Sequence, residues 1–331
     1  MSLSQILLGI ILLVQVSSTA YAADPFTDFG LGRPKVLSGN SFDYAGQVSP
    51  QTGTDGPNTS PTILENQLRG SLLLYKDEKD TWGLNAKAGS FHLGNSMTIP
   101  GDGVVIPQNL WDLEVGGSYR HKISDREESS LSASVGSASE VPFHSIREVI
   151  FQTTFIYKIP AANENSWLFF LNESNNRSFL NYIPLPGIAY MVHSPSTGID
   201  AVIGIPFASI VYHPNPFWAF QASVFGPAAY SLEADYIPSL TLQFYSVLNR
   251  AEQLWALSNR TDTKDRLFYE RKKTGLGVRS TALAPVALDL FGGWEFGRRF
   301  FEAESILSSD RQFADMIPSW FVQLKIGYYP L

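Results

Sequence analysis

Charged side chains recur at alternate positions of this sequence, between apolar neighbours. Glu114, for example, lies between Leu113 and Val115. Carboxylate, ammonium and guanidinium groups hold ions, exchange protons or form ion pairs, and on one face of a strand they bring this chemistry to one side of a wall. The positions with this pattern are Lys87, Asp112, Glu114, Arg120, Glu233, Asp235, Arg271, Lys273, Arg279, Asp289, Glu295 and Lys325.

Both signs of charge occur in this set. Strong selectivity for anions or cations requires a ring of one sign, so the mixed set argues against such selectivity. Two interpretations stay open: structural ion pairs inside a filled interior, or solvated groups along a solute pathway. The net charge of −7 argues against nucleic acid as a partner.

Sites of other kinds find little support. No Gly-x-Ser-x-Gly motif is present, the five histidines do not cluster at ligand spacing, and the absence of cysteine excludes thiolate chemistry. Asp262 and Asp265 offer oxygen atoms to calcium, but without EF-hand spacing. Gly101-Asp102-Gly103 is followed by no Lys-Ser/Thr pair, so it is a turn. We therefore expect no enzyme, no metal site and no cofactor.

The elements that must position the charges are β-strands. After residue 34, segments of about ten residues alternate apolar and polar side chains, and a period of two sends alternate side chains to opposite faces. In the final segment Val322 and Leu324 oppose Gln323 and Lys325. Counting every segment gives 16 strands, and merging the shortest ones near Ile188 to His213 gives 14.

The connections alternate in length as well. Short polar turns occur at Lys76–Asp80, Ser124–Glu127 and Pro160–Glu164. Longer connections occur at Ser49–Thr62, Gly94–Gln108, Ser139–Ile146 and Asn172–Pro184, and a polar loop is expected at Asn249–Lys264. Short turns on one rim and long loops on the other are typical of outer-membrane barrels. In the middle of the chain, prolines recur at Pro186, Pro206 and Pro227. Proline belongs at strand ends, so this spacing predicts compact hairpins with tight turns at both rims, which would make this side of the barrel a low wall.

Composition distinguishes a membrane barrel from a soluble β-sandwich. Charged residues make up 17 % of the chain, below the roughly 25 % of soluble domains, and aromatic residues make up 13 %. We therefore predict an all-β fold: a closed antiparallel transmembrane β-barrel of about 14–16 strands, with short periplasmic turns and longer extracellular loops.

The amino terminus resembles a secretory signal. Ile6 to Val16 is apolar but too short for a spanning helix, and Ala20-Tyr21-Ala22 is a small-x-small cleavage pattern, although no basic residue precedes the apolar run. We expect a signal peptide at 1–22, a periplasmic lead at 23–34 and one barrel at 35–331. These expectations predict export to the bacterial outer membrane.

Two stretches of the second half carry a family resemblance. Gly204 to Trp218, with its His213-Pro214-Asn215-Pro216 turn, and Gly292 to Phe301 are similar to features of an uncharacterised, porin-like family of bacterial outer-membrane β-barrel proteins. The resemblance implies a fold and a location, but no activity. The ending Pro330-Leu331 departs from the aromatic last residue that the barrel-assembly machinery recognises.

Three functions follow from a barrel with a charged interior. The first is a porin-like passive channel for small solutes. The second is a plugged structural or surface-binding barrel without transport, for which Gly94–Gln108 and Asn249–Lys264 are the candidate plugs. The third is a carrier of an apolar ligand, with inward candidates Phe217, Phe225, Tyr245 and Phe291. The expected partners are outer-membrane lipid and, during insertion, the barrel-assembly machinery; the oligomeric state is left open.

Overall fold

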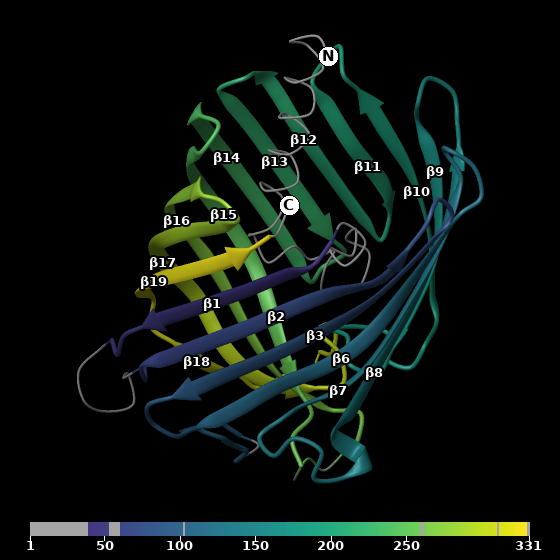
Figure 1. Ribbon diagram of the computed structural model, residues 1–331. Helices are drawn as coiled ribbons and strands as arrows, with labels where there is room; N and C mark the ends of the chain where they lie inside the picture. The colour runs from purple at the N-terminus through teal and green to yellow at the C-terminus, as the bar shows by residue number, and fades with distance from the viewer. Residues whose placement is uncertain are drawn as a thin grey trace.

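The chain folds into a closed antiparallel β-barrel (Figure 1). The computed structural model describes residues 39–52, 60–101, 103–258, 260, 262–309 and 311–329, so the expected signal peptide at 1–22 and the lead at 23–34 lie outside the described residues. The wall strands are β1 (Ser41–Ser49), β2 (Ile63–Lys76), β3 (Asp80–Leu93), β6 (Asn109–Lys122), β7 (Glu128–Ser139), β8 (Val149–Pro160), β9 (Ser166–Ser174), β10 (Leu185–Ser194), β11 (Ile199–Ile205), β12 (Phe207–Asn215), β13 (Trp218–Phe225), β14 (Ala229–Ser239), β15 (Leu242–Trp255), β16 (Arg266–Leu283), β17 (Val286–Ala303) and β19 (Ser319–Tyr328).

The first and last strands close the ring. β1 pairs with β2 on one side and with β19 on the other, where Phe42 lies opposite Tyr328. The barrel therefore has 16 strands, which confirms the upper of the two predicted counts. The remaining elements belong to the connections: β4 (Met97–Thr98) pairs with β5 (Val105–Ile106), β18 (Ala314–Met316) pairs with the end of β17, and η2 (Ile146–Glu148) is a 3-10 turn. No helix in the described part of the chain is long and apolar enough to span a membrane.

The two rims differ as the sequence predicted. The short-turn rim holds both ends of the barrel and the connections 77–79, 123–127, 161–165, 195–198, 216–217, 240–241 and 284–285. The loop rim holds the connections 50–62, 94–108, 140–148, 175–184, 206, 226–228, 256–265 and 304–318. Pro206 alone joins β11 to β12, so the proline-rich hairpins do form a low wall. The expected polar loop at Asn249–Lys264 begins later, because β15 continues to Trp255.

Alternation along each strand gives the wall an apolar outer face. Six of the seven tryptophans, at positions 82, 111, 167, 218, 294 and 320, point outward and are 40–49 % exposed. Trp82 stacks on Tyr119 and Trp218 packs on Tyr236 near the short-turn rim, where amphipathic rings favour a membrane interface. Trp255 is the exception, since only 3 % of it is exposed.

Strand length explains why Trp255 differs. β16 and β17 have 18 residues each, well beyond the roughly 9–11 that a tilted strand needs to cross a bilayer. Their pairing shifts register between Glu270 and Lys272, and Gly297 on β17 has a φ of +57°, a backbone conformation that glycine adopts without steric cost. Beyond this bend the three strands enter the barrel, and in Figure 1 β15 passes behind β1 and β2.

We call the inward part of these strands the flap. It consists of Arg250–Trp255 of β15, Arg266–Glu270 of β16 and Arg298–Ala303 of β17. The three-residue strand β18 pairs with its outer edge on β17.

Candidate functional site

The lumen contains a cavity of about 490 Å³, and the residues that line it show which strand leaves the barrel wall. Residues of β1–β3 and β6–β8 line it in runs of at most three. Asn249 to Trp255 of β15, in contrast, line it as one unbroken run of seven. Consecutive residues of a strand point to opposite faces, so both faces of distal β15 meet the lumen. The flap therefore stands inside the barrel.

One face of the flap packs against the wall formed by β2, β3 and β6–β8. Trp255, Tyr269 and Phe300 surround Phe91 of β3, with ring centroids 5.3, 5.1 and 6.0 Å away. The same cluster includes Ile99 and Ile106 from the 94–108 connection, both fully buried. The loop-rim mouth is filled by apolar side chains on this side.

The other face packs against the low wall. Phe268 and Phe301 stack at 4.7 Å and belong to one apolar cluster with Phe170, Phe207 and Phe225, inward residues of β9, β12 and β13. The absence of a side chain at Gly187 leaves room for the ring of Phe170, since a Cβ there would lie 1.8 Å from that ring. The flap is thus held between two opposite walls.

Hydrogen bonds tie the flap and its loops to the wall. The backbone nitrogen of Ala256 donates to the oxygen of Ala138 at the end of β7, 2.7 Å away. Gln253 Nε2 donates to Glu65 Oε2 on β2 at 2.9 Å. Between the 304–318 and 175–184 connections, Ile306 N donates to Ser178 O at 2.7 Å. These contacts join segments far apart in the chain.

Glu295 is the centre of a buried ionic cluster at the base of the flap. Its carboxylate accepts from Gln47 Nε2 at 2.8 Å and from Ser49 Oγ at 2.9 Å on β1. Arg271 lies 3.3 Å away and Lys273 3.4 Å away. Arg271 also binds both carboxylate oxygens of Glu65, one of them at 2.7 Å, and Arg298 Nε lies 3.6 Å from Glu295. Every charge of this cluster has a partner of opposite sign.

A second cluster lies toward the short-turn rim. Arg279 Nε contacts Asp289 Oδ2 at 3.1 Å, its Nη1 lies 3.6 Å from Glu233, and Tyr245 donates to Asp289 at 2.5 Å. Gln221 and Gln243 donate to Asp235 at 3.1 and 2.6 Å. Lys325 lies opposite Asp289 in the ladder between β17 and β19. Opposite charges are again placed side by side.

A third cluster lies at the bend, and sequence patterns missed it. Arg250 Nε and Arg299 Nη2 contact Glu270 at 3.1 and 2.6 Å, and Arg250 also reaches Glu252 at 3.2 Å. By alternation Arg250 and Glu252 belong to the outer face of β15. They are enclosed because the strand has left the wall.

The remaining predicted residues lie nearer open space. Lys87 pairs with Asp112 at 2.5 Å, both partly exposed to the lumen. Glu114 follows on the same face of β6 and lines the cavity. Arg120 lies near the short-turn end of β6, opposite Thr81. Neither Glu114 nor Arg120 has an ion-pair partner within the described ranges.

A comparison with known proteins gives similarity in fold only. No family model matches the chain, and no curated protein matches it. Three matching structures are the translocator domain of the autotransporter NalP from Neisseria meningitidis (12 % identity, 95 % of this chain and 100 % of that one, TM-score 0.32), an outer membrane channel from Pseudomonas putida F1 (7 %, 87 % and 94 %, 0.35) and a mutant of the Rh. blastica porin (9 %, 87 % and 98 %, 0.39). The likeness is to outer-membrane β-barrel proteins and is one of fold.

Other candidate groups serve local structure. His121 contacts Asp80 at 2.8 Å, and Asp265 N donates to Asp262 O at 3.2 Å within a turn. Among the described residues, no three His, Asp or Glu side chains are grouped as a metal site would require. Of the apolar candidates, Phe225, Tyr245 and Phe291 are buried inside, whereas Phe217 lies exposed in a turn.

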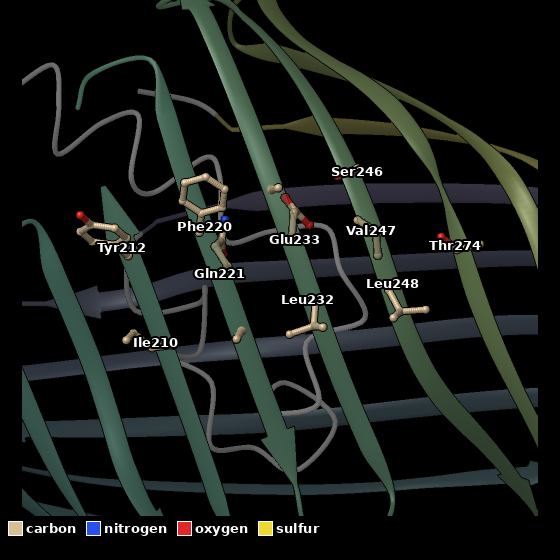
Figure 2. Close-up of a pocket in the computed structure, with 12 residues that line it drawn as sticks. Ile210, Tyr212, Phe220, Gln221, Leu232, Glu233, Ser246, Val247, Leu248 and Thr274 are labelled. Carbon is tan, nitrogen blue, oxygen red and sulfur yellow. The ribbon is translucent and has the colours of Figure 1, made fainter. Parts of the chain in front are cut away.

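A second hollow, of about 450 Å³, lies on the outer face across β12–β16 (Figure 2). Its floor is formed by small outward residues, Ala222, Ala234 and Ser246, between larger ones such as Phe220 and Leu232. It belongs to the apolar outer face and is separate from the lumen.

Proposed function

We propose that this chain is an outer-membrane channel for small solutes, closed at the loop rim by its own flap. The observation that carries the proposal is the flap between two walls, with Phe91 on one side and Phe170 on the other. An open porin has a water-filled interior, whereas apolar rings fill the mouth of this barrel. Passage then requires the flap to move.

The outer face supports the membrane location. Exposed tryptophans and aliphatic side chains surround the wall, while the charged clusters face inward. A closed barrel leaves no unpaired strand edge, which is the condition for spanning lipid with strands. We propose outer-membrane lipid as its surroundings, the barrel-assembly machinery as its partner during insertion, and no catalytic activity.

The bend gives the flap a point about which it can move. The wall part of β15–β17 and the flap meet at a register shift and at Gly297, so the flap can change direction without breaking the wall ladder. The cluster of Arg250, Glu270 and Arg299 lies at this junction and joins the three strands of the flap to one another.

A disulfide lock tests this proposal. Ala138 and Ala256 are small, buried and joined by a backbone hydrogen bond, and the native chain has no cysteine. In a variant with Ala138→Cys and Ala256→Cys, oxidation should hold the flap to β7 and abolish single-channel openings in planar bilayers. Reduction should restore the openings of the unmodified protein.

The control is Ala256→Cys alone, whose openings should not respond to oxidant. Equal openings in the oxidised and reduced double variant would refute a flap gate. A well-folded protein without openings in any redox state would instead support the second candidate, a plugged structural barrel. The apolar packing on both faces of the flap is the observation that favours that alternative.

A further inference from the structure

The cavity below the flap has one wall without charge. Asn85 on β3, Ser118 on β6, Ser132 and Ser134 on β7 and Gln152 on β8 line it, and we call these five residues the neutral face. Ladder pairing makes them neighbours, because Ser118 pairs with Ser132 and Ser134 pairs with Gln152. Amide and hydroxyl groups therefore form one continuous surface.

The polar side chains of the neutral face have no hydrogen-bond partners among the described protein groups. In the part of the chain that the structure describes, the side chains of Asn85, Ser132, Ser134 and Gln152 form no hydrogen bond with protein groups. Ser118 Oγ is buried and has no partner in the same part of the chain. Buried polar groups are normally satisfied, so these donors and acceptors require water or a ligand.

The absence of a side chain at Gly116 leaves room for the amide of Asn85. Gly116 lies between Asn85 and Ser134 in the ladder, and a Cβ there would lie 2.9 Å from Asn85 Oδ1. The cavity floor, in contrast, is apolar: Phe91, Leu110 and Trp255 close it toward the loop rim. A compound that satisfies both parts has hydroxyl groups on its edges and an apolar face.

The charges nearby do not favour an ion. Arg271 and Lys273 already face Glu65 and Glu295. Glu114, the carboxylate nearest the neutral face, lies opposite Lys87 in the ladder. A charged solute would therefore lose its hydration without gaining a counter-charge that lacks a neighbour of opposite sign. The cavity volume of about 490 Å³ lies within the roughly 300–1,000 Å³ of small-molecule sites.

We propose that the neutral face binds an uncharged polyhydroxylated solute, of the size of a simple sugar, below the closed flap. The biological role of this site rests on the proposed channel function, because the transported solute would bind there before the flap opens. Binding itself does not require opening.

The test is saturation-transfer NMR on the full-length barrel in detergent micelles, with glucose as the probe and glutamate and lysine as charged comparators. Glucose should show transfer and the charged compounds should not. Asn85→Leu with Gln152→Leu should weaken glucose binding about tenfold or more, because each change removes hydrogen bonds at nearly constant volume. Asn109→Leu, an exposed amide at the start of β6 that does not line the cavity, is the matched control and should bind as the unmodified protein does.

Transfer to charged solutes equal to that of glucose, or unchanged binding by the Asn85 and Gln152 variant, would overturn the inference. The oxidised Ala138 and Ala256 cysteine variant separates it from the gate. Binding that persists in this locked form supports a site below the flap, and binding lost there contradicts it. Single-channel conductance in planar bilayers tests the channel proposal independently of these binding results.

Discussion

Replacing Trp255 by alanine is expected to open the barrel. The indole is 3 % exposed and its ring centroid lies 5.3 Å from that of Phe91, so truncation removes one of the three aromatic contacts between the flap and Phe91 of the wall. Large aromatic truncations in cores cost about 3–5 kcal/mol. If the closed state loses ~3 kcal/mol of stability relative to the open state, the ratio of open to closed protein rises roughly hundredfold. Planar-bilayer recording should show frequent openings of Trp255→Ala where the unmodified protein is mostly closed.

Trp111→Ala is the matched control for this experiment. Trp111 lies on the outer face of β6 and is 42 % exposed, so its loss leaves the flap untouched. Its conductance should equal that of the unmodified protein. A folded Trp255→Ala barrel that stays as closed as the unmodified one would show that the flap contact does not hold the mouth shut.

Glu295→Gln is expected to have the largest effect on stability. The change keeps the shape of the side chain but leaves Arg271, Lys273 and Arg298 without their shared carboxylate. Breaking a buried ionic group on one side typically costs about 3–5 kcal/mol, because the remaining charges stay buried. The free energy of unfolding, measured by urea titration in lipid vesicles, should fall by this amount.

Glu114→Gln provides the comparison within the same lumen. Glu114 lines the cavity and has no ion-pair partner among the described residues. Its unfolding free energy should change by no more than about 0.5 kcal/mol. Equal losses for both variants would mean that the cluster around Glu295 does not stabilise the barrel specifically.

The barrel wall was predictable because its physics is local. Each strand has one face toward the outside and one toward the lumen, and this leaves a period of two that is visible in segments such as Trp320–Tyr328. Connection length added an independent signal, and both agree with the observed rims. The lumen charges follow the same alternation.

The flap was not predictable from alternation, because both of its faces are buried. Buried strands appear as continuous apolar runs, here Leu267-Phe268-Tyr269 and Phe300-Phe301. These runs, together with strands too long for a bilayer, are the signal that would have indicated it. The sequence did indicate 94–108 and 249–264 as candidate plugs, and Ile99, Ile106, Trp255 and Leu257 of these segments belong to one buried apolar cluster.

Partner choice among the charges depends on the tertiary arrangement. Arg271 and Glu65 are 206 residues apart and meet because the ring closes through β1 and β19 and because β16 bends inward. Arg250 and Glu252 occupy outward positions by alternation, and only the bend encloses them with Glu270. A sequence pattern gives the face of a residue on its own strand but does not reveal a strand that leaves the wall.

Tryptophan quenching tests the inward flap most directly. In vesicles of lipids brominated in their acyl chains, the six outward tryptophans should be quenched, whereas Trp255 inside the lumen should keep emitting. We predict a residual emission from the unmodified protein that disappears in Trp255→Phe. Complete quenching of the unmodified protein, or a residual emission that Trp255→Phe leaves unchanged, would contradict a flap folded into the barrel.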